Sequence, residues 1–198
     1  MADGIAVLAY PDTCGSEEHC LAACQDDAIQ MTWLPFSGNE TVGRWRDEIE
    51  REAAGLGIAY VRLGGNIAVV GSGAGLAMAT VDLIRDSGGE PANFLDTGGR
   101  ITREHVWNCL NIVMKNPKVA AVLVNMYGGI NPMVEAAHGI VEFIAERRLR
   151  LPVVVKLRGN SEEEAWRILE SAGLHVVKTS QTEDATSLIV ALLRKSSS

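Results

Sequence analysis

The chain has 198 residues, of which 47% are hydrophobic and 22% charged, a composition typical of a soluble globular protein with one core and room for a short extension. Its formal net charge of −7 disfavours general binding to nucleic acid or to an anionic membrane surface. No apolar run approaches the roughly 18 residues that cross a bilayer, and the start Met-Ala-Asp-Gly carries no basic segment, so we expect a cytoplasmic protein.

The first 44 residues are less regular than the rest of the chain. Residues 5–9 and 28–34 have the composition of strands, with a helical segment at 17–25 between them. We therefore expect a short βαβ-like extension at 1–44. A charged amphipathic helix follows at 45–54.

Three cysteines stand close together in this extension. Cys14, Cys20 and Cys24 match the first, third and fourth positions of a C-x2-C-x2-C-x3-C cluster motif. Glu17 replaces the second cysteine, and Gln25 stands where the motif carries proline. This pattern favours plain reduced thiols, with an iron–sulfur or metal site as the alternative.

From residue 66 onward, strand and helix patterns alternate and glycines separate them. Strands are expected at 67–70, 93–95, 119–127, 153–157 and 175–178, and helices at 76–87, 103–115, 133–148, from 162 onward and at 184–194. The alternation predicts an α/β fold, a flavodoxin-like doubly wound parallel sheet with helices on both faces. We assign this domain to residues 45–195, with a frayed tail at 196–198.

The strand at 119–127 leads through Gly128, Gly129, Ile130 and Asn131 to Pro132, the expected first residue of a helix. A helix that starts directly after two glycines presents unpaired backbone N–H groups and a partial positive charge. The motif therefore predicts an anion site made from the backbone. The alternative is a tight turn that binds nothing.

A second glycine-rich turn, residues 71–75, follows the strand at 67–70. Such a turn is compatible with a nucleotide or dinucleotide site. A dinucleotide site also needs an acidic residue at a strand end about 20 residues further on, and Asp96 fits this position poorly because it belongs to a different loop. Carboxylates at strand ends, such as Asp96 and Glu90, more often cap turns than act in acid–base chemistry. No histidine has a carboxylate at a triad-like offset, so we assign no catalytic residue.

Several ordered segments resemble the C-terminal ligase domain of the succinyl-CoA synthetase β subunit, in the family of NDP-forming acyl-CoA synthetases. The resemblance runs from about residue 46 to 193. The matching segments are Tyr-Val-Arg-Leu-Gly-Gly-Asn-Ile (60–67), Gly-Ala-Gly-Leu-Ala-Met-Ala-Thr-Val-Asp (73–82), Gly-Gly-Glu-Pro-Ala-Asn-Phe-Leu-Asp-Thr-Gly-Gly (88–99), Ala-Val-Leu-Val-Asn (121–125), Gly-Gly-Ile (128–130), Pro-Val-Val-Val (152–155) and Leu-Arg-Gly-Asn (157–160).

The resemblance implies a subunit of an acid–CoA ligase, a type of enzyme known from the tricarboxylic acid cycle. In that family an ATP-grasp domain binds nucleotide and magnesium ahead of this domain, and we expect it on a separate subunit here. The phosphohistidine and the CoA site belong to the α subunit of the family. We therefore expect CoA, ATP or GTP and Mg to be bound through partner subunits and none of them by this chain alone. A homodimer is a further possibility.

The resemblance also assigns residues that face the phosphohistidine and a small carboxylic acid. These residues are Gly128, Gly129, Ile130 and Asn131, with Ser72 and Gly73 beside them. This chain departs from the family pattern at two places: Ser72 stands at a usual asparagine, and Asn131-Pro132 replaces Val-Arg. The lost arginine could have paired with a distal carboxylate, which argues against succinate as the acid.

Two other hypotheses about the function remain open. One is a Rossmann-like nucleotide- or dinucleotide-binding module that uses residues 71–75. The other is a non-catalytic scaffold subunit that keeps only the family's fold and its subunit interface.

Overall fold

The computed structural model describes residues 48–99 and 101–196. Of these, residues 49–99 and 101–196 belong to one compact unit. The extension expected at 1–44, with Cys14, Cys20 and Cys24, lies outside the described residues.

Helices and strands alternate along the described chain, as predicted. The elements are α2 (Glu48–Gly55), β1 (Ala59–Arg62), β2 (Ile67–Gly71), α3 (Ala74–Asp86), β3 (Asn93–Asp96), α4 (Arg103–Met114), β4 (Ala121–Gly128), α5 (Met133–Arg147), β5 (Val153–Gly159), α6 (Glu162–Ser171), β6 (His175–Val176) and α7 (Thr182–Ser196).

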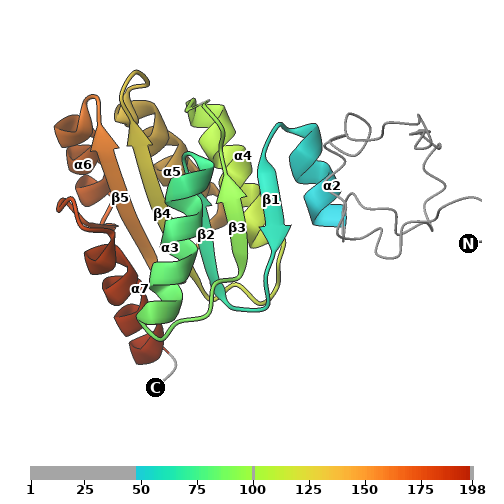
Figure 1. The fold of residues 1–198 in the computed structure, drawn as a ribbon. Helices are drawn as coiled ribbons and strands as arrows, with labels where there is room; N and C mark the ends of the chain where they lie inside the picture. The colour runs from blue at the N-terminus through green and yellow to red at the C-terminus, as the bar shows by residue number, and fades with distance from the viewer. Residues whose placement is uncertain (1–47, 100, 197–198) are drawn as a thin grey trace, which may run out of the picture. The chain divides into compact units, whose positions relative to one another are not determined.

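One sheet carries all six strands in the order β1-β3-β2-β4-β5-β6 (Figure 1). Strands β2 to β6 run parallel, and their order is that of flavodoxin-like sheets when β2 is counted first. The predicted doubly wound α/β fold is thus confirmed. The prediction missed β1, which pairs antiparallel with β3 at the edge of the sheet.

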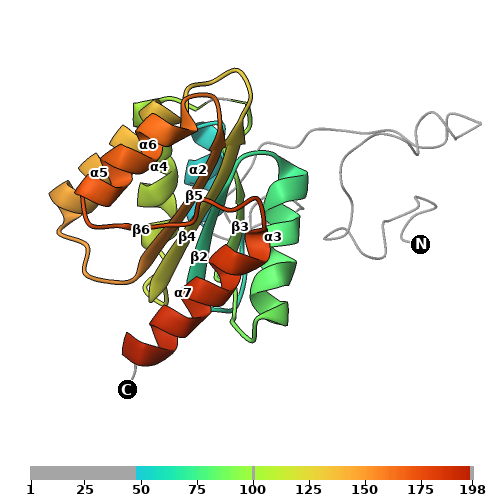
Figure 2. The ribbon, with the colours of Figure 1, turned by 90° about the vertical axis from the view of Figure 1, so that its left-hand side faces the viewer.

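Helices cover both faces of the sheet (Figure 2). Helices α4, α5 and α6 lie on one face and α3 and α7 on the other. Strand β2 is buried throughout, and β4 is buried at every position except Tyr127. This matches the near-continuous apolar runs expected of parallel strands that are covered on both sides.

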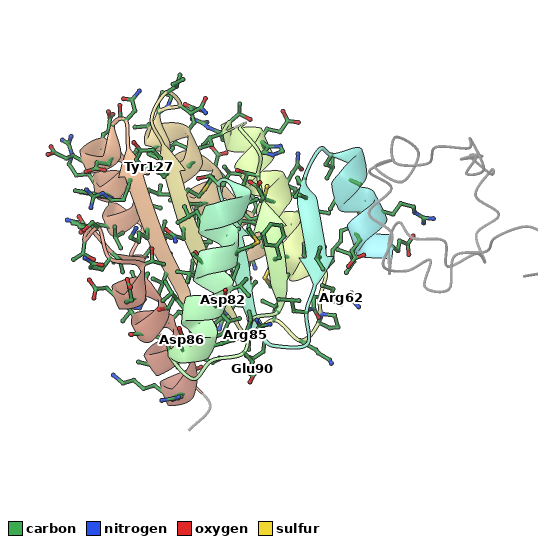
Figure 3. The ribbon with its side chains drawn as sticks, viewed as in Figure 1. Arg62, Asp82, Arg85, Asp86, Glu90 and Tyr127 are labelled. Atoms are coloured by element: carbon green, nitrogen blue, oxygen red, sulfur yellow. The ribbon has the colours of Figure 1, made fainter. Side chains whose placement is uncertain are left out.

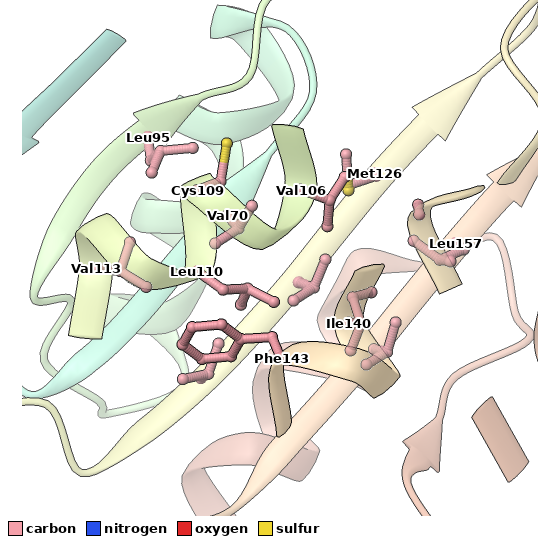
Figure 4. Close-up of a cluster of buried hydrophobic side chains, with 14 of the residues drawn as sticks. Val70, Leu95, Val106, Cys109, Leu110, Val113, Met126, Ile140, Phe143 and Leu157 are labelled. Carbon is pink, nitrogen blue, oxygen red and sulfur yellow. The ribbon is translucent and has the colours of Figure 1, made fainter. Parts of the chain in front are cut away.

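The larger hydrophobic cluster lies between the sheet and α4 and α5 (Figure 4). Phe143 is its largest fully buried side chain, and the Trp107 ring packs edge-on against it at 5.4 Å between ring centroids. At the start of α4, the Thr102 hydroxyl accepts a hydrogen bond from His105 N and so caps the helix.

The predicted bounds of α5 and α7 differ from the observed ones by one or two residues. Pro132 has the φ of a helix but a ψ of 127°, so it is the N-cap and α5 begins at Met133. Ser196 belongs to α7, where its hydroxyl donates to the carbonyl of Leu193 one turn earlier, and not to a frayed tail. Among the described residues, no helix has the length and apolar character needed to cross a membrane.

Candidate functional site

The carboxyl ends of β2 and β4 lie side by side where the winding of the sheet changes direction. β2 leads into α3 on one face, whereas β4 leads into α5 on the other (Figure 2). Ligands of doubly wound sheets bind in the crevice at such a point. The β2–α3 loop (residues 72–73) and the β4–α5 loop (residues 129–132) border this crevice.

Asn160, at the end of β5, holds the β4–α5 loop by three hydrogen bonds. Its backbone N–H donates to the Gly128 carbonyl at 2.8 Å, and its side-chain amide donates to the Ile130 carbonyl at 3.1 Å. Its own carbonyl accepts from Met133 N at 2.9 Å. The carbonyl groups of Gly128 and Ile130 are therefore committed to a neighbouring loop of the same protein.

Two further side chains fix the loop at its other side and at its base. The Asn131 side-chain amide donates to the Gly99 carbonyl at 3.0 Å. The Ser72 hydroxyl donates to the Tyr127 carbonyl at 3.0 Å and accepts from Tyr127 N at 2.8 Å. Ser72 thus joins the ends of β2 and β4 across the crevice, which gives the loop a fixed starting point.

Close packing of two backbones explains the glycines at the ends of β4 and β5. Gly159 has a φ of +113°, and a Cβ atom there would overlap the Gly128 carbonyl. A Cβ atom on Gly128 would overlap the Met133 side chain. Glycine at position 159 therefore lets the two strand ends approach this closely, whereas at position 128 the Met133 side chain and the Asn131 carbonyl leave no room for a side chain.

The backbone N–H groups of the β4–α5 loop remain available to a ligand. Within the described part of the chain, the backbone N–H groups of Gly129, Ile130 and Asn131 donate to no acceptor. Gly129 and Ile130 are exposed, and Asn131 is half-buried. Three consecutive N–H donors at the carboxyl edge of a sheet form the kind of backbone array that binds anions.

The first turn of α5 contributes fewer donors than the sequence predicted. Met133 N donates to Asn160, and Glu135 N donates to the Pro132 carbonyl at 3.3 Å. Val134 N is the first-turn amide that has no acceptor among the described residues. The unpaired donors therefore come mainly from the loop, while the helix still adds the positive end of its dipole.

The β2–α3 loop is arranged differently, because a carboxylate of the protein occupies it. Asp96 Oδ1 accepts from Gly73 N at 2.6 Å and from Gly98 N at 2.8 Å. This confirms the expected turn-capping role of Asp96. The Ser72 hydroxyl and the Gly73 N–H are thus bonded within the protein.

Two large apolar side chains stand out beside the loop. Tyr127 is 63% exposed and Ile130 is 91% exposed. Figure 3 shows Tyr127 at the end of the sheet opposite Glu90 and Arg62, which is the carboxyl end of the parallel strands. Its ring lies near Gly129.

Glu162 stabilises the turn between β5 and α6. Its Oε2 atom accepts from Gly159 N at 2.6 Å and from Arg158 Nε at 2.9 Å. The hydrogen bond from Gly159, together with Arg158, holds the pKa of the Glu162 carboxyl below its usual 4.5. The carboxylate thus ties the end of β5 to the start of α6, where Ser161, in left-handed conformation, makes no side-chain cap.

A cavity of about 470 Å³ lies at the start of α6. Its lining includes three consecutive glutamates, residues 162–164, together with Arg167. These carboxylates disfavour an anion there. Among the described residues, no group of three histidine, cysteine or acidic side chains is arranged to hold a metal ion.

Two groups with reactive chemistry lie in the core. Burial raises the pKa of the Cys109 thiol to about 12, with the negative charge of Asp96 adding to the effect. His105 is buried, and its Nε2 atom lies 3.0 Å from the Thr97 carbonyl oxygen. Neither group is brought to the crevice as a nucleophile or base.

The residue that sequence reasoning missed is Asn160. The Gly159-Asn160-Ser161 turn was expected only to lead into a helix. An available signal was the convergence of all strand-end loops on one edge, where an asparagine commonly fixes a neighbouring loop.

Comparison with known proteins places this domain in a family. A family model described as CoA-ligase matches residues 70–190. The chain belongs to the CoA-ligase family. This agrees with the resemblance to the ligase domain of the succinyl-CoA synthetase β subunit.

Three curated relatives are β subunits of succinate–CoA ligases. The ADP-forming subunit of Desulfurococcus amylolyticus is 45% identical over 152 residues, which is 77% of this chain and 40% of the relative. The GDP-forming subunit of Thermus thermophilus is 43% identical over 145 residues, 73% of this chain and 38% of the relative. The human mitochondrial GDP-forming subunit is 43% identical over 149 residues, 75% of this chain and 34% of the relative. The chain thus spans 34% to 40% of these relatives.

Solved structures support the fold. An ATP citrate lyase of Methanosaeta concilii in complex with (3S)-citryl-CoA superposes with a TM-score of 0.66 at 18% identity, covering 79% of this chain and 46% of the lyase. The acetyl-coenzyme A synthetase 1 of Ca. Korarchaeum cryptofilum superposes with a TM-score of 0.57 at 22% identity, covering 70% of this chain and 37% of the synthetase.

Proposed function

We propose that this chain is a subunit of an NDP-forming acid–CoA ligase and contributes the half of the active site that faces the acid substrate and the phosphohistidine. The main support is the set of three consecutive N–H groups at Gly129, Ile130 and Asn131 that donate to no acceptor in the described residues. They lie at the point of the sheet where such folds bind ligands. Donors of this kind suit phosphoryl and carboxylate oxygens.

In the proposed reaction, a carboxylate oxygen of the acid attacks the phosphorus of the partner's phosphohistidine. The P–N bond breaks and an acyl phosphate forms. The CoA thiol then attacks the acyl carbon, loses its proton, and phosphate leaves as the thioester forms. Both steps need negative charge on oxygen to be stabilised, which fixed amide donors and the start of α5 can do without proton transfer. This chain supplies no covalent nucleophile.

The remaining parts of the site are proposed to lie on other chains. An α-like subunit would carry the CoA site and the phosphohistidine, and a separate ATP-grasp subunit would bind ATP or GTP with Mg. The exposed Tyr127 and Ile130 would form the apolar part of the surface that the α-like subunit covers. Alternatively, a second copy of this chain would bury the same surface in a homodimer.

The acid is proposed to be a small carboxylic acid other than succinate. The family's arginine is replaced by Asn131-Pro132, and the Asn131 side-chain amide is already bonded to the Gly99 carbonyl. No guanidinium at this position is therefore available for a second carboxylate of the substrate. The reaction type remains that of the ligase known from the tricarboxylic acid cycle.

The dinucleotide-binding alternative is disfavoured by Asp96. A pyrophosphate at the start of α3 would compete with this carboxylate for Gly73 N. The scaffold alternative has the same fold and the same exposed surface, so only activity separates it from the ligase.

The test is to isolate the tagged chain with its natural partners under native conditions and to treat the complex with radiolabelled ATP or GTP. We expect label on a partner histidine, and release of that label when a carboxylic acid and CoA are added together. Ile130→Glu places a carboxylate beside the donors at a 91% exposed position, so it should block label release without affecting folding. A complex that never takes up or releases label would support the scaffold. Saturable micromolar binding of NAD(P) by fluorescence titration would support the dinucleotide module.

A further inference from the structure

Tyr127 is an exception within the central strand β4. Its side chain is 63% exposed at the carboxyl end of the strand (Figure 3), whereas the other seven residues of β4 are buried. Its hydroxyl group makes no hydrogen bond with any described residue. A large aromatic side chain contributes most to stability when it is buried, so this exposed phenol calls for an explanation.

The backbone from which this side chain extends is held on both sides. The Ser72 hydroxyl donates to the Tyr127 carbonyl at 3.0 Å and accepts from Tyr127 N at 2.8 Å. On the other side, Tyr127 is in register with Arg158 of β5. The phenol therefore extends from a fixed point at the edge of the sheet.

The ring lies beside Gly129, the first of the three N–H donors of the β4–α5 loop. A Cβ atom on Gly129 would stand 3.8 Å from both Cε1 and the hydroxyl oxygen of Tyr127. Since that Cβ position is about 2.5 Å from Gly129 N, the hydroxyl oxygen is at most about 6.3 Å from this donor. An oxyanion can bridge such a gap, because two of its oxygens each accept at about 2.7–3.0 Å.

The other polar side chains that hold the loop are already bonded within the protein. Ser72 is bonded to the Tyr127 backbone, and the amides of Asn131 and Asn160 donate to backbone carbonyls. Compared with these three side chains, the Tyr127 hydroxyl is the donor that is left for a ligand. The resemblance assigned Ser72 to the ligand, but its hydroxyl instead fixes the residue that carries this donor.

We propose that Tyr127 is a substrate-contacting residue whose hydroxyl donates a hydrogen bond to the oxyanion held by the N–H groups of residues 129–131. This inference rests on the proposed function, because it assumes that an anion binds at the loop. It adds one side-chain donor to a site otherwise made from backbone. The oxyanion is either the carboxylate of the acid or the phosphoryl group, which share this chemistry.

A phenol hydroxyl suits this role chemically. It donates to a charged oxygen, which gives a stronger hydrogen bond than a neutral acceptor does, and it keeps its proton throughout the proposed reaction. Because it carries no charge, it orients one oxygen of the anion without selecting for a second carboxylate. The apolar faces of the ring remain free for the surface that the partner covers.

The experiment uses the full chain, labelled with ¹⁵N and with ¹³C in the tyrosine rings. Sulfate stands for the phosphoryl group and acetate for the carboxylate. Affinity is measured from the backbone amide shifts of Gly129 and Ile130, and stability from urea unfolding. In the wild type, the ring signals of Tyr127 should shift with the same dissociation constant as the Gly129 amide, which a purely structural phenol would not do.

Tyr127→Phe removes the hydroxyl and keeps the ring. We expect it to weaken binding of at least one of the two anions about three- to tenfold, and the anion affected identifies the group that the hydroxyl contacts. The unfolding midpoint should stay unchanged, because the hydroxyl is bonded to no described residue. Ser171→Ala is the control, since it removes an exposed hydroxyl at the C-terminal end of α6, and it should leave both affinities unchanged.

Equal affinity of wild type and Tyr127→Phe for both anions would overturn this inference and leave the proposed function standing. A clear loss of stability in Tyr127→Phe would also overturn it, since it would show a structural role for the hydroxyl. Absence of saturable shifts at Gly129 in the wild type with either anion would overturn the proposed function together with the inference.

Discussion

Single polar side chains decide which backbone groups of the β4–α5 loop remain available. Asn160 occupies the carbonyls of Gly128 and Ile130, and Asn131 ties the loop to Gly99. The N–H groups of residues 129–131 donate to no described residue and are left for a ligand. The glycines allow this conformation, but the asparagines select it.

Glu162 provides a prediction at the residue scale. Glu162→Gln removes the charge from the acceptor of Gly159 N and Arg158 Nε, and should cost about 1 kcal/mol of unfolding free energy at neutral pH. Because the folded-state pKa is lowered, this stabilisation is present above the unfolded pKa near 4.5 and is lost as the pH falls through the folded pKa. Urea unfolding at pH 7 and below pH 4 measures the difference.

Glu163→Gln is the matched control, because its side chain is exposed on the same turn. It should change stability little at either pH. A loss in Glu162→Gln that persists unchanged in acid, or that equals the loss in Glu163→Gln, would contradict the role given to this carboxylate.

The sequence identified the loop and two of the residues that hold it, Asn131 and Ser72. Gly128 to Asn131 were predicted from a local pattern, strand then glycines then helix. Asn160 acts through contacts with a distant segment, which no local pattern contains.

At the scale of elements, the close approach of β4 and β5 at their carboxyl ends sets the position of the loop. Gly159→Ala would place a Cβ atom against the Gly128 carbonyl and would require a φ of +113° that alanine rarely adopts. We expect a loss of about 1–3 kcal/mol in unfolding free energy and weaker anion binding at the loop. Urea unfolding and sulfate titration test the two effects.

Gly75→Ala is the comparison for this variant. It lies in α3, where nothing stands within 4 Å of the added methyl group, and alanine favours the helix. Its stability should equal or exceed that of wild type. If Gly159→Ala behaved like Gly75→Ala, the packing argument for the strand ends would be wrong.

Most elements could be predicted from the sequence, because their patterns are local. β4 and α5 have long apolar runs or helical spacing, and both were found within two residues of their bounds. β1 was missed because it has only four residues, and its antiparallel pairing with β3 depends on contacts across the turn and α3.

At the scale of the whole molecule, an anion would have to be bound by local donors. The chain carries a net charge of −7, so its overall field does not attract anions. The donors lie beside exposed apolar side chains, Tyr127 and Ile130, at one edge of the sheet. The chain spans 34% to 40% of its ligase relatives, and under the proposed function this edge is the half of a site that a partner would complete.

The most direct test of this account is a titration of the ¹⁵N-labelled chain with inorganic phosphate, followed by backbone amide shifts. We predict saturable shifts centred on Gly129, Ile130 and Asn131, with Val134 responding less and Gly73 unchanged because Asp96 occupies its N–H. Shifts centred on Gly73 to Gly75, or no saturable shift at residues 129–131, would contradict the account.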